Sequence, residues 1–146
     1  MQNLLRQRAS IETGHLVEPL GAMAASHVDV HDLADVAVAV ANGAFDGRAL
    51  TLTGPAAITG EEMAATLSGV TGRPVRYVLP SVAELRAALT GRGLPGWQVG
   101  AVVELQEAVL AGKAPHLALV TADVETATGR RPRSFAQFAR REFGAP

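Results

Sequence analysis

Three side chains of the types that bind metals, His27, Asp29 and His31, alternate with valines near residue 30. Alternate residues of a strand point to the same face and lie roughly 7 Å apart, which is too far to hold one ion comfortably without a bend. We therefore interpret the three as the polar face of a strand and predict no metal site.

The motifs of two common enzyme classes are missing from the sequence. A serine hydrolase needs a Gly-x-Ser-x-Gly elbow, and a dinucleotide-binding turn needs a glycine-rich stretch between a strand and a helix. The three glycines of residues 91–96 follow a predicted helix and are interrupted by Pro95, so we interpret them as a loop between helices. The single tyrosine and single lysine, Tyr77 and Lys113, are too far apart for a Tyr-x-x-x-Lys relay. We assign no catalytic residue.

The His27–His31 alternation runs directly into apolar residues with helical spacing, from Leu33 to Ala41. This change predicts a short strand followed by a helix, with Asp32 as the N-cap. If Asp32 is the cap, Asp32→Ala should cost roughly 0.5–2 kcal/mol and Asp32→Asn much less. The alternative is a catalytic carboxylate, for which both substitutions would abolish activity.

The remaining patterns predict a single α/β domain over residues 1–146, with few short strands and a helix-rich C-terminal half. Strands are predicted at 15–19, 48–53 and 74–80, the last at a sheet edge because prolines flank it. Capping boxes that open helices are predicted at Thr59/Glu62, Ser81/Glu84 and Ser134/Gln137.

Composition argues against several kinds of partner. There are 13 basic and 14 acidic residues and no cysteine, so we expect no attraction to nucleic acid or membranes and no disulfide. Arg130 to Arg133 form a short basic cluster, which we interpret as a solvated turn rather than a phosphate site. No signal peptide or long apolar run is present, so we expect a soluble, cytoplasmic protein. The bias toward arginine, alanine, glycine and valine suggests a bacterial source.

Five stretches in order resemble the C-terminal half of the NmrA-like NAD(P)-binding family of atypical short-chain dehydrogenases/reductases. The stretches are Met1–Leu5, His27–Ala37, Leu52–Thr59, Gly72–Val78 and Thr128–Phe135. The resemblance implies a partial Rossmann-like domain from an NAD(P)-dependent oxidoreductase or redox sensor, with quinone oxidoreductase type 2 among its relatives.

The resemblance also implies a position for substrate or cofactor near the start of the chain. Gln2 and Asn3 match the family's stretch beside the nicotinamide and substrate, and the alternative is a solvent-facing helix start. The family's glycine-rich loop and first strands are absent, so we expect this chain alone to bind no NAD(P) and to be inactive. It would then be a truncated product, the result of a wrongly chosen start codon, or a reduced module.

A second hypothesis is a module that binds a small molecule or a protein and acts as a homo-oligomer. Part of a Rossmann-type sheet should expose strand edges and apolar surface, which proteins usually cover by pairing. We therefore expect a homodimer.

Overall fold

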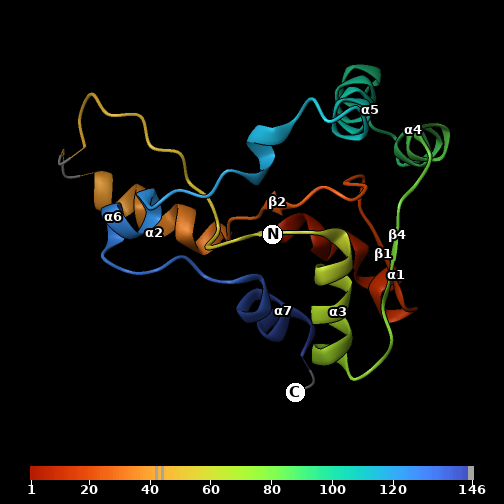
Figure 1. The fold of residues 1–146 in the computed structure, drawn as a ribbon, viewed down its shortest axis with the longest axis horizontal. Helices are drawn as coiled ribbons and strands as arrows, with labels where there is room; N and C mark the ends of the chain where they lie inside the picture. The colour runs from red at the N-terminus through yellow and green to blue at the C-terminus, as the bar shows by residue number, and fades with distance from the viewer. Residues whose placement is uncertain (42, 44, 145–146) are drawn as a thin grey trace.

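The computed structural model describes residues 1–41, 43 and 45–144. Within them the helices are η1 (Gln2–Gln7), α1 (Arg8–Glu12), α2 (Val30–Val40), α3 (Gly60–Thr71), α4 (Val82–Gly91), α5 (Gly96–Leu110), η2 (Pro115–Ala118), α6 (Asp123–Thr128) and α7 (Phe135–Phe143). The strands are β1 (His15–Val17), β2 (Ala25–Ser26), β3 (Ala57–Ile58) and β4 (Arg76–Val78). The predicted α/β class, with short strands and a helix-rich C-terminal half, is confirmed (Figure 1).

Two pairs of short strands join distant parts of the chain. Strands β1 and β4 are parallel, with Leu16 opposite Tyr77, and strands β2 and β3 are antiparallel, with Ala25 opposite Ile58. The Tyr77 hydroxyl donates to the carbonyl oxygen of Glu18 at 2.9 Å and so reinforces the first pair. Within the described residues β4 has only β1 as a neighbour, which agrees with the edge position that its flanking prolines indicate.

Three helices begin at the capping boxes predicted from the sequence. The Thr59 hydroxyl accepts a hydrogen bond from the Glu62 backbone at 3.2 Å, and the Glu62 carboxylate accepts one from the Thr59 backbone at 2.8 Å. Helices α4 and α7 begin with the same reciprocal arrangement. These contacts satisfy N–H groups that have no partner within the helix, so each start is fixed locally.

The main core lies between helices α3 and α7 and the β1–β4 pair, with the α1 segment against it (Figure 1). Phe138 is fully buried there, and its ring centroid lies 6.0 Å from that of Phe135 and 6.2 Å from that of Phe143. Helices α4 and α5 have a smaller core of their own and lie at one end of the molecule, with α2 and α6 at the other. No helix in the described ranges is long and apolar enough to cross a membrane.

The strand predicted at residues 48–53 is not formed. Only one edge of this segment forms backbone hydrogen bonds with the described residues. The Thr51 N–H donates to the Asp123 carboxylate at 2.6 Å, and the Thr51 carbonyl accepts from the Thr121 hydroxyl. A strand needs a neighbouring backbone, and none of the described segments pairs with this one. The prediction is wrong because alternation identifies a segment suited to a sheet but does not supply its partner.

Candidate functional site

Helix α2 begins at Asp29 rather than at Asp32. Oδ1 of Asp29 accepts from the His31 backbone N–H at 3.0 Å, which makes Asp29 the N-cap, and residues 30–32 are already helical. Strand β2 ends at Ser26. The predicted strand through His31 and the predicted cap at Asp32 are therefore both wrong. An aspartate can cap at either position, and contacts from distant segments favour Asp29.

The Asp29 side chain is fully buried and gathers three donors. Besides the His31 backbone, Gln2 donates through Nε2 to Oδ1 at 2.8 Å, and Arg141 of α7 donates through Nη2 to Oδ2 at 2.8 Å. Burial alone would raise the pKa of Asp29, but the hydrogen bonds from His31, Arg141 and Gln2 more than offset it, so the pKa is lowered. The carboxylate is thus held in its charged form at neutral pH.

Gln2 and Asn3, the two predicted site residues, have different surroundings. Both ends of the Gln2 amide are used, because Oε1 also accepts from the Val30 backbone N–H at 3.0 Å. The Asn3 side chain is exposed and forms no hydrogen bond with the described residues. Gln2 therefore holds the start of α2, while Asn3 presents a free amide. Their contact with substrate or cofactor stays a prediction.

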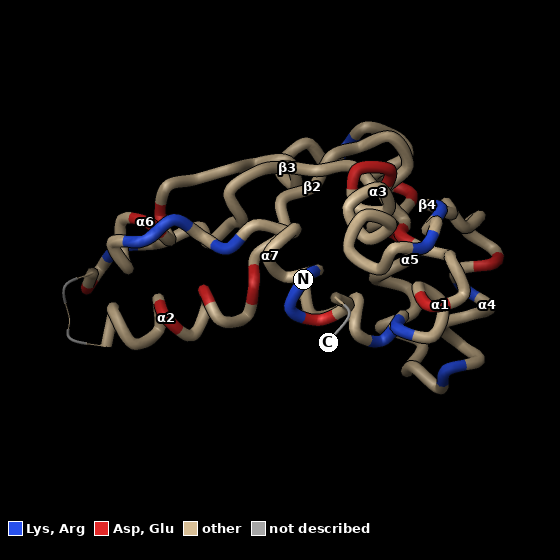
Figure 2. The backbone as a smooth tube through the Cα atoms, turned by 90° about the horizontal axis from the view of Figure 1, so that it is seen from below, with Lys and Arg blue, Asp and Glu red and all other residues tan. Residues whose placement is uncertain are grey.

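The basic cluster after α6 lies along the acidic side of α2 (Figure 2). Asp32 accepts from the Arg133 backbone N–H at 2.8 Å and pairs with the Arg133 guanidinium group. Oδ2 of Asp35 lies 2.9 Å from Nη1 of Arg133 and 3.0 Å from Nη2 of Arg130. The hydrogen bond from Arg133 lowers the pKa of Asp35. The interpretation of this cluster as a solvated turn is therefore wrong for Arg133, whereas the Arg130 side chain stays 65% exposed. The Asp32 carboxylate joins α2 to Arg133 by a hydrogen bond and an ion pair.

His27 lines a small cavity of about 200 Å³ beside the capped end of α2. The cavity is lined mostly by apolar side chains, together with Thr66 and Ser134. Nε2 of His27 is buried without a hydrogen-bond partner among the described residues. Burial lowers the pKa of His27 to about 4. His31 is exposed and Asp29 is used as the cap. In the described part of the chain, no three His, Cys, Asp or Glu side chains are grouped to hold a metal ion.

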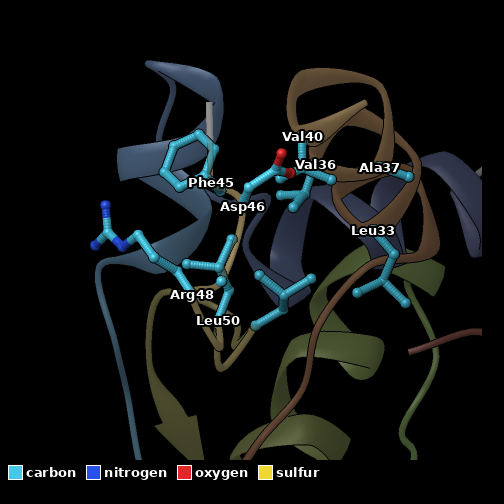
Figure 3. Close-up of a pocket in the computed structure, with 10 residues that line it drawn as sticks. Leu33, Val36, Ala37, Val40, Phe45, Asp46, Arg48 and Leu50 are labelled. Atoms are coloured by element: carbon cyan, nitrogen blue, oxygen red, sulfur yellow. The ribbon is translucent and has the colours of Figure 1, made fainter. Parts of the chain in front are cut away.

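An open apolar groove of about 450 Å³ runs along the other side of α2 (Figure 3). One wall is the predicted apolar stripe of the helix, and the other is the segment that follows it. The lining residues are Leu33, Val36, Ala37, Val40, Phe45, Asp46, Gly47, Arg48, Leu50 and Leu52. Leu33 is 37% exposed although it belongs to the predicted buried stripe, so part of the stripe lacks a covering element among the described residues.

The known proteins with a similar sequence or structure include several reductases. The chain is 40% identical to an NAD(P)H azoreductase from Xenophilus azovorans, over 99% of the chain and 50% of that protein. An NADPH-dependent quinone oxidoreductase from Escherichia coli, solved with NADPH, matches 98% of the chain and 50% of its own length, with 25% identity and a TM-score of 0.79. A triphenylmethane reductase from Citrobacter sp. matches 94% of the chain and 47% of its own length, with 22% identity and a TM-score of 0.75. No family model matches the chain.

The fold is that of one half of a Rossmann-like reductase, as these structural matches show. The relatives are NAD(P)H-dependent reductases, and they confirm the predicted resemblance to the C-terminal half of NmrA-like NAD(P)-binding proteins. The chain spans about half the length of the relatives that it matches.

The sequence patterns did not indicate the two arginines that bind the aspartates at the start of α2. Arg141 and Arg133 belong to the C-terminal segments, and nothing in their local pattern relates them to α2. The sequence did contain one indication that Asp29 caps α2. Asp29 and Asp32 stand at the N-cap and N3 positions of α2, a spacing similar to that of the capping boxes.

Proposed function

We propose that this chain is the substrate-side half of an NAD(P)H-dependent oxidoreductase or redox sensor, and that it transfers no hydride by itself. One observation carries the proposal: 40% identity along 99% of the chain to an azoreductase of which it covers half. We place this role in the cytoplasm. The chain has no cysteine and therefore no disulfide, the feature typical of proteins in oxidising compartments.

The described residues do not fit the pyrophosphate of a dinucleotide. Such a group needs free N–H groups at a helix start that follows a glycine-rich turn. The starts of α2, α3, α4 and α7 are each occupied by their own capping side chain. The start of α5 has no capping side chain, but it follows another helix and not a strand. Of the three glycines of residues 91–96, Gly91 ends α4, Gly93 lies between the helices and Gly96 begins α5, so the segment joins two helices, as predicted. The nucleotide therefore has to be held by another part of the enzyme.

Gln2 and Asn3 are the residues that we propose to lie next to substrate or cofactor in the complete enzyme. The family resemblance supports both positions, and the exposed amide of Asn3 supports a direct contact there. Gln2 would act by positioning, because its amide already joins Asp29 to the first turn of α2.

The isolated chain should not oxidise NADH or NADPH above the blank rate with an azo dye or a quinone as acceptor, because it lacks a dinucleotide site. The measurement is the loss of nicotinamide absorbance over time, with the Xenophilus azovorans azoreductase as the positive control. A fusion that places the first half of that azoreductase before residues 1–146 should regain oxidation. Steady oxidation by the isolated chain, or none by a folded fusion, would contradict the proposal.

A second candidate function is a homo-oligomeric module that binds a small apolar molecule or a protein. The open groove of about 450 Å³ beside α2 favours it. In that case sedimentation at micromolar concentration should show a dimer, and a small apolar compound should raise the melting temperature by mass action. A folded monomer that no such compound stabilises would exclude this candidate.

A further inference from the structure

Close contacts fix the backbone around His27, which lines the cavity of about 200 Å³. Gly54 lies so near the His27 backbone that a Cβ atom at position 54 would overlap the His27 carbonyl oxygen. The Gly54 N–H donates to the Ser26 hydroxyl at 3.1 Å, and the Met1 amine donates to the Val28 carbonyl oxygen at 2.8 Å. Because the residues on both sides of His27 are held, its imidazole has a defined place in the cavity wall.

His27 carries the one buried side-chain nitrogen or oxygen of the described lining that has no hydrogen-bond partner. The Thr66 hydroxyl donates to the Glu62 carbonyl oxygen at 2.8 Å, and the Ser134 hydroxyl exchanges hydrogen bonds with Gln137. Nε2 of His27 is buried and has no such partner among the described residues. Burying a polar group without a hydrogen bond costs free energy. The cavity therefore favours a molecule that supplies one hydrogen bond.

The size and lining of the cavity indicate a small ring with one polar group. An apolar cavity of about 150 Å³ in another protein is large enough for benzene. Water is held in a cavity by two to four polar partners, whereas the buried side chains of this lining offer one. A neutral imidazole nitrogen either donates or accepts a hydrogen bond, and a hydroxyl group can match it in both cases. A mostly apolar lining disfavours a charged ligand.

The cavity lies next to an open groove through which a ligand can reach it. Helices α3 and α7 pack against each other (Figure 1), and Thr66 of α3 and Ala136 of α7 line both the cavity and the groove. We propose that the cavity beside His27 is a binding site for a small uncharged phenol, with the ring among the apolar side chains and the hydroxyl bonded to Nε2 of His27. The inference goes beyond the proposed function, because it requires neither NAD(P)H nor the other half of the enzyme.

The test compares phenol with toluene, which has nearly the same shape but no hydroxyl group. Titration of the whole chain with each compound, followed by two-dimensional NMR, should give saturable shifts of the amides of Ala56, Ile58 and Ala136. Phenol should also move the Nε2 resonance of His27, and toluene should not, because only phenol can form the hydrogen bond. Shifts confined to other residues, such as the lining of the groove beside α2, would overturn the inference.

A substitution of His27 separates the hydrogen bond from the fit of the ring. The ratio of the Kd of toluene to the Kd of phenol should be about tenfold higher in the parent than in His27→Leu, because one hydrogen bond of about 1.4 kcal/mol corresponds to a factor of ten. Ala37→Gln changes an exposed residue of the groove beside α2, and this control should keep the ratio of the parent. An equal ratio in His27→Leu and the parent would overturn the inference.

A second variant keeps the test decisive if His27→Leu does not fold. Ala136→Leu places a larger side chain in the cavity wall, so it should weaken the binding of both compounds about tenfold or more. A folded Ala136→Leu variant that binds phenol as tightly as the parent would show that phenol occupies another site. Absence of saturable phenol binding in the millimolar range or below would overturn the inference, whether or not the fusion with the azoreductase half oxidises NADPH.

Discussion

Asp29→Ala should lower the free energy of unfolding by about 3 kcal/mol, combining a lost helix cap with lost hydrogen bonds to a charged group. The substitution leaves Gln2, Arg141 and the first turn of α2 without their shared acceptor. The pKa of Asp29 is lower in the folded state than in the unfolded state, so the Asp29 carboxylate stabilises the folded protein at neutral pH. This stabilisation is lost as the pH falls below the pKa that Asp29 has in the unfolded state. Denaturant unfolding at pH 7 and at acidic pH measures both effects.

Two further variants show which property of Asp29 matters. Asp29→Asn keeps an oxygen that can cap α2 but loses the charge that Arg141 contacts, so it should cost about 1 kcal/mol. Asp46→Ala removes an exposed aspartate and should stay within about 0.5 kcal/mol of the parent. Equal stability of Asp29→Ala and Asp46→Ala would refute the assignment of Asp29 as the residue that fixes the start of α2.

Acidification should destabilise the protein through His27, by up to about 3 kcal/mol between neutral pH and pH 4. Burial lowers the pKa of His27 from 6.5 to about 4. Between those values the unfolded state binds a proton that the folded state does not, so the free energy of unfolding falls as the pH decreases. Unfolding free energies across this range, with the imidazole followed by NMR, measure the effect.

His27→Leu should remove most of this pH dependence, because leucine does not titrate and suits the mostly apolar lining of the cavity. His116→Leu is the matched control, because His116 is exposed. This variant should show the same dependence of unfolding free energy on pH as the parent. An imidazole of His27 that titrates at its ordinary value in the folded protein would show that the side chain is solvated.

The sequence by itself determined the features that depend on neighbouring residues. The capping boxes join residues three positions apart, and Gly72 ends α3 with a φ of 68°, a conformation that glycine adopts without steric cost. Such contacts form within one turn of chain, so the residue types alone specify them. The resemblance to NmrA-like proteins was also visible in the sequence, because it depends on five motifs in a fixed order.

Only the tertiary structure decided at which residue α2 begins and which groups its aspartates contact. Asp29 and Asp32 are both suitable caps, and the choice depends on Gln2, 27 residues before Asp29, and Arg141, 112 residues after it. Arg133 lies 101 residues from Asp32, so its local sequence could indicate only an exposed turn. Residues 48–53 have the alternation of a strand, but a strand exists only where a second backbone accepts its hydrogen bonds. Local patterns specify what a segment can form, and its partners in space determine what it does form.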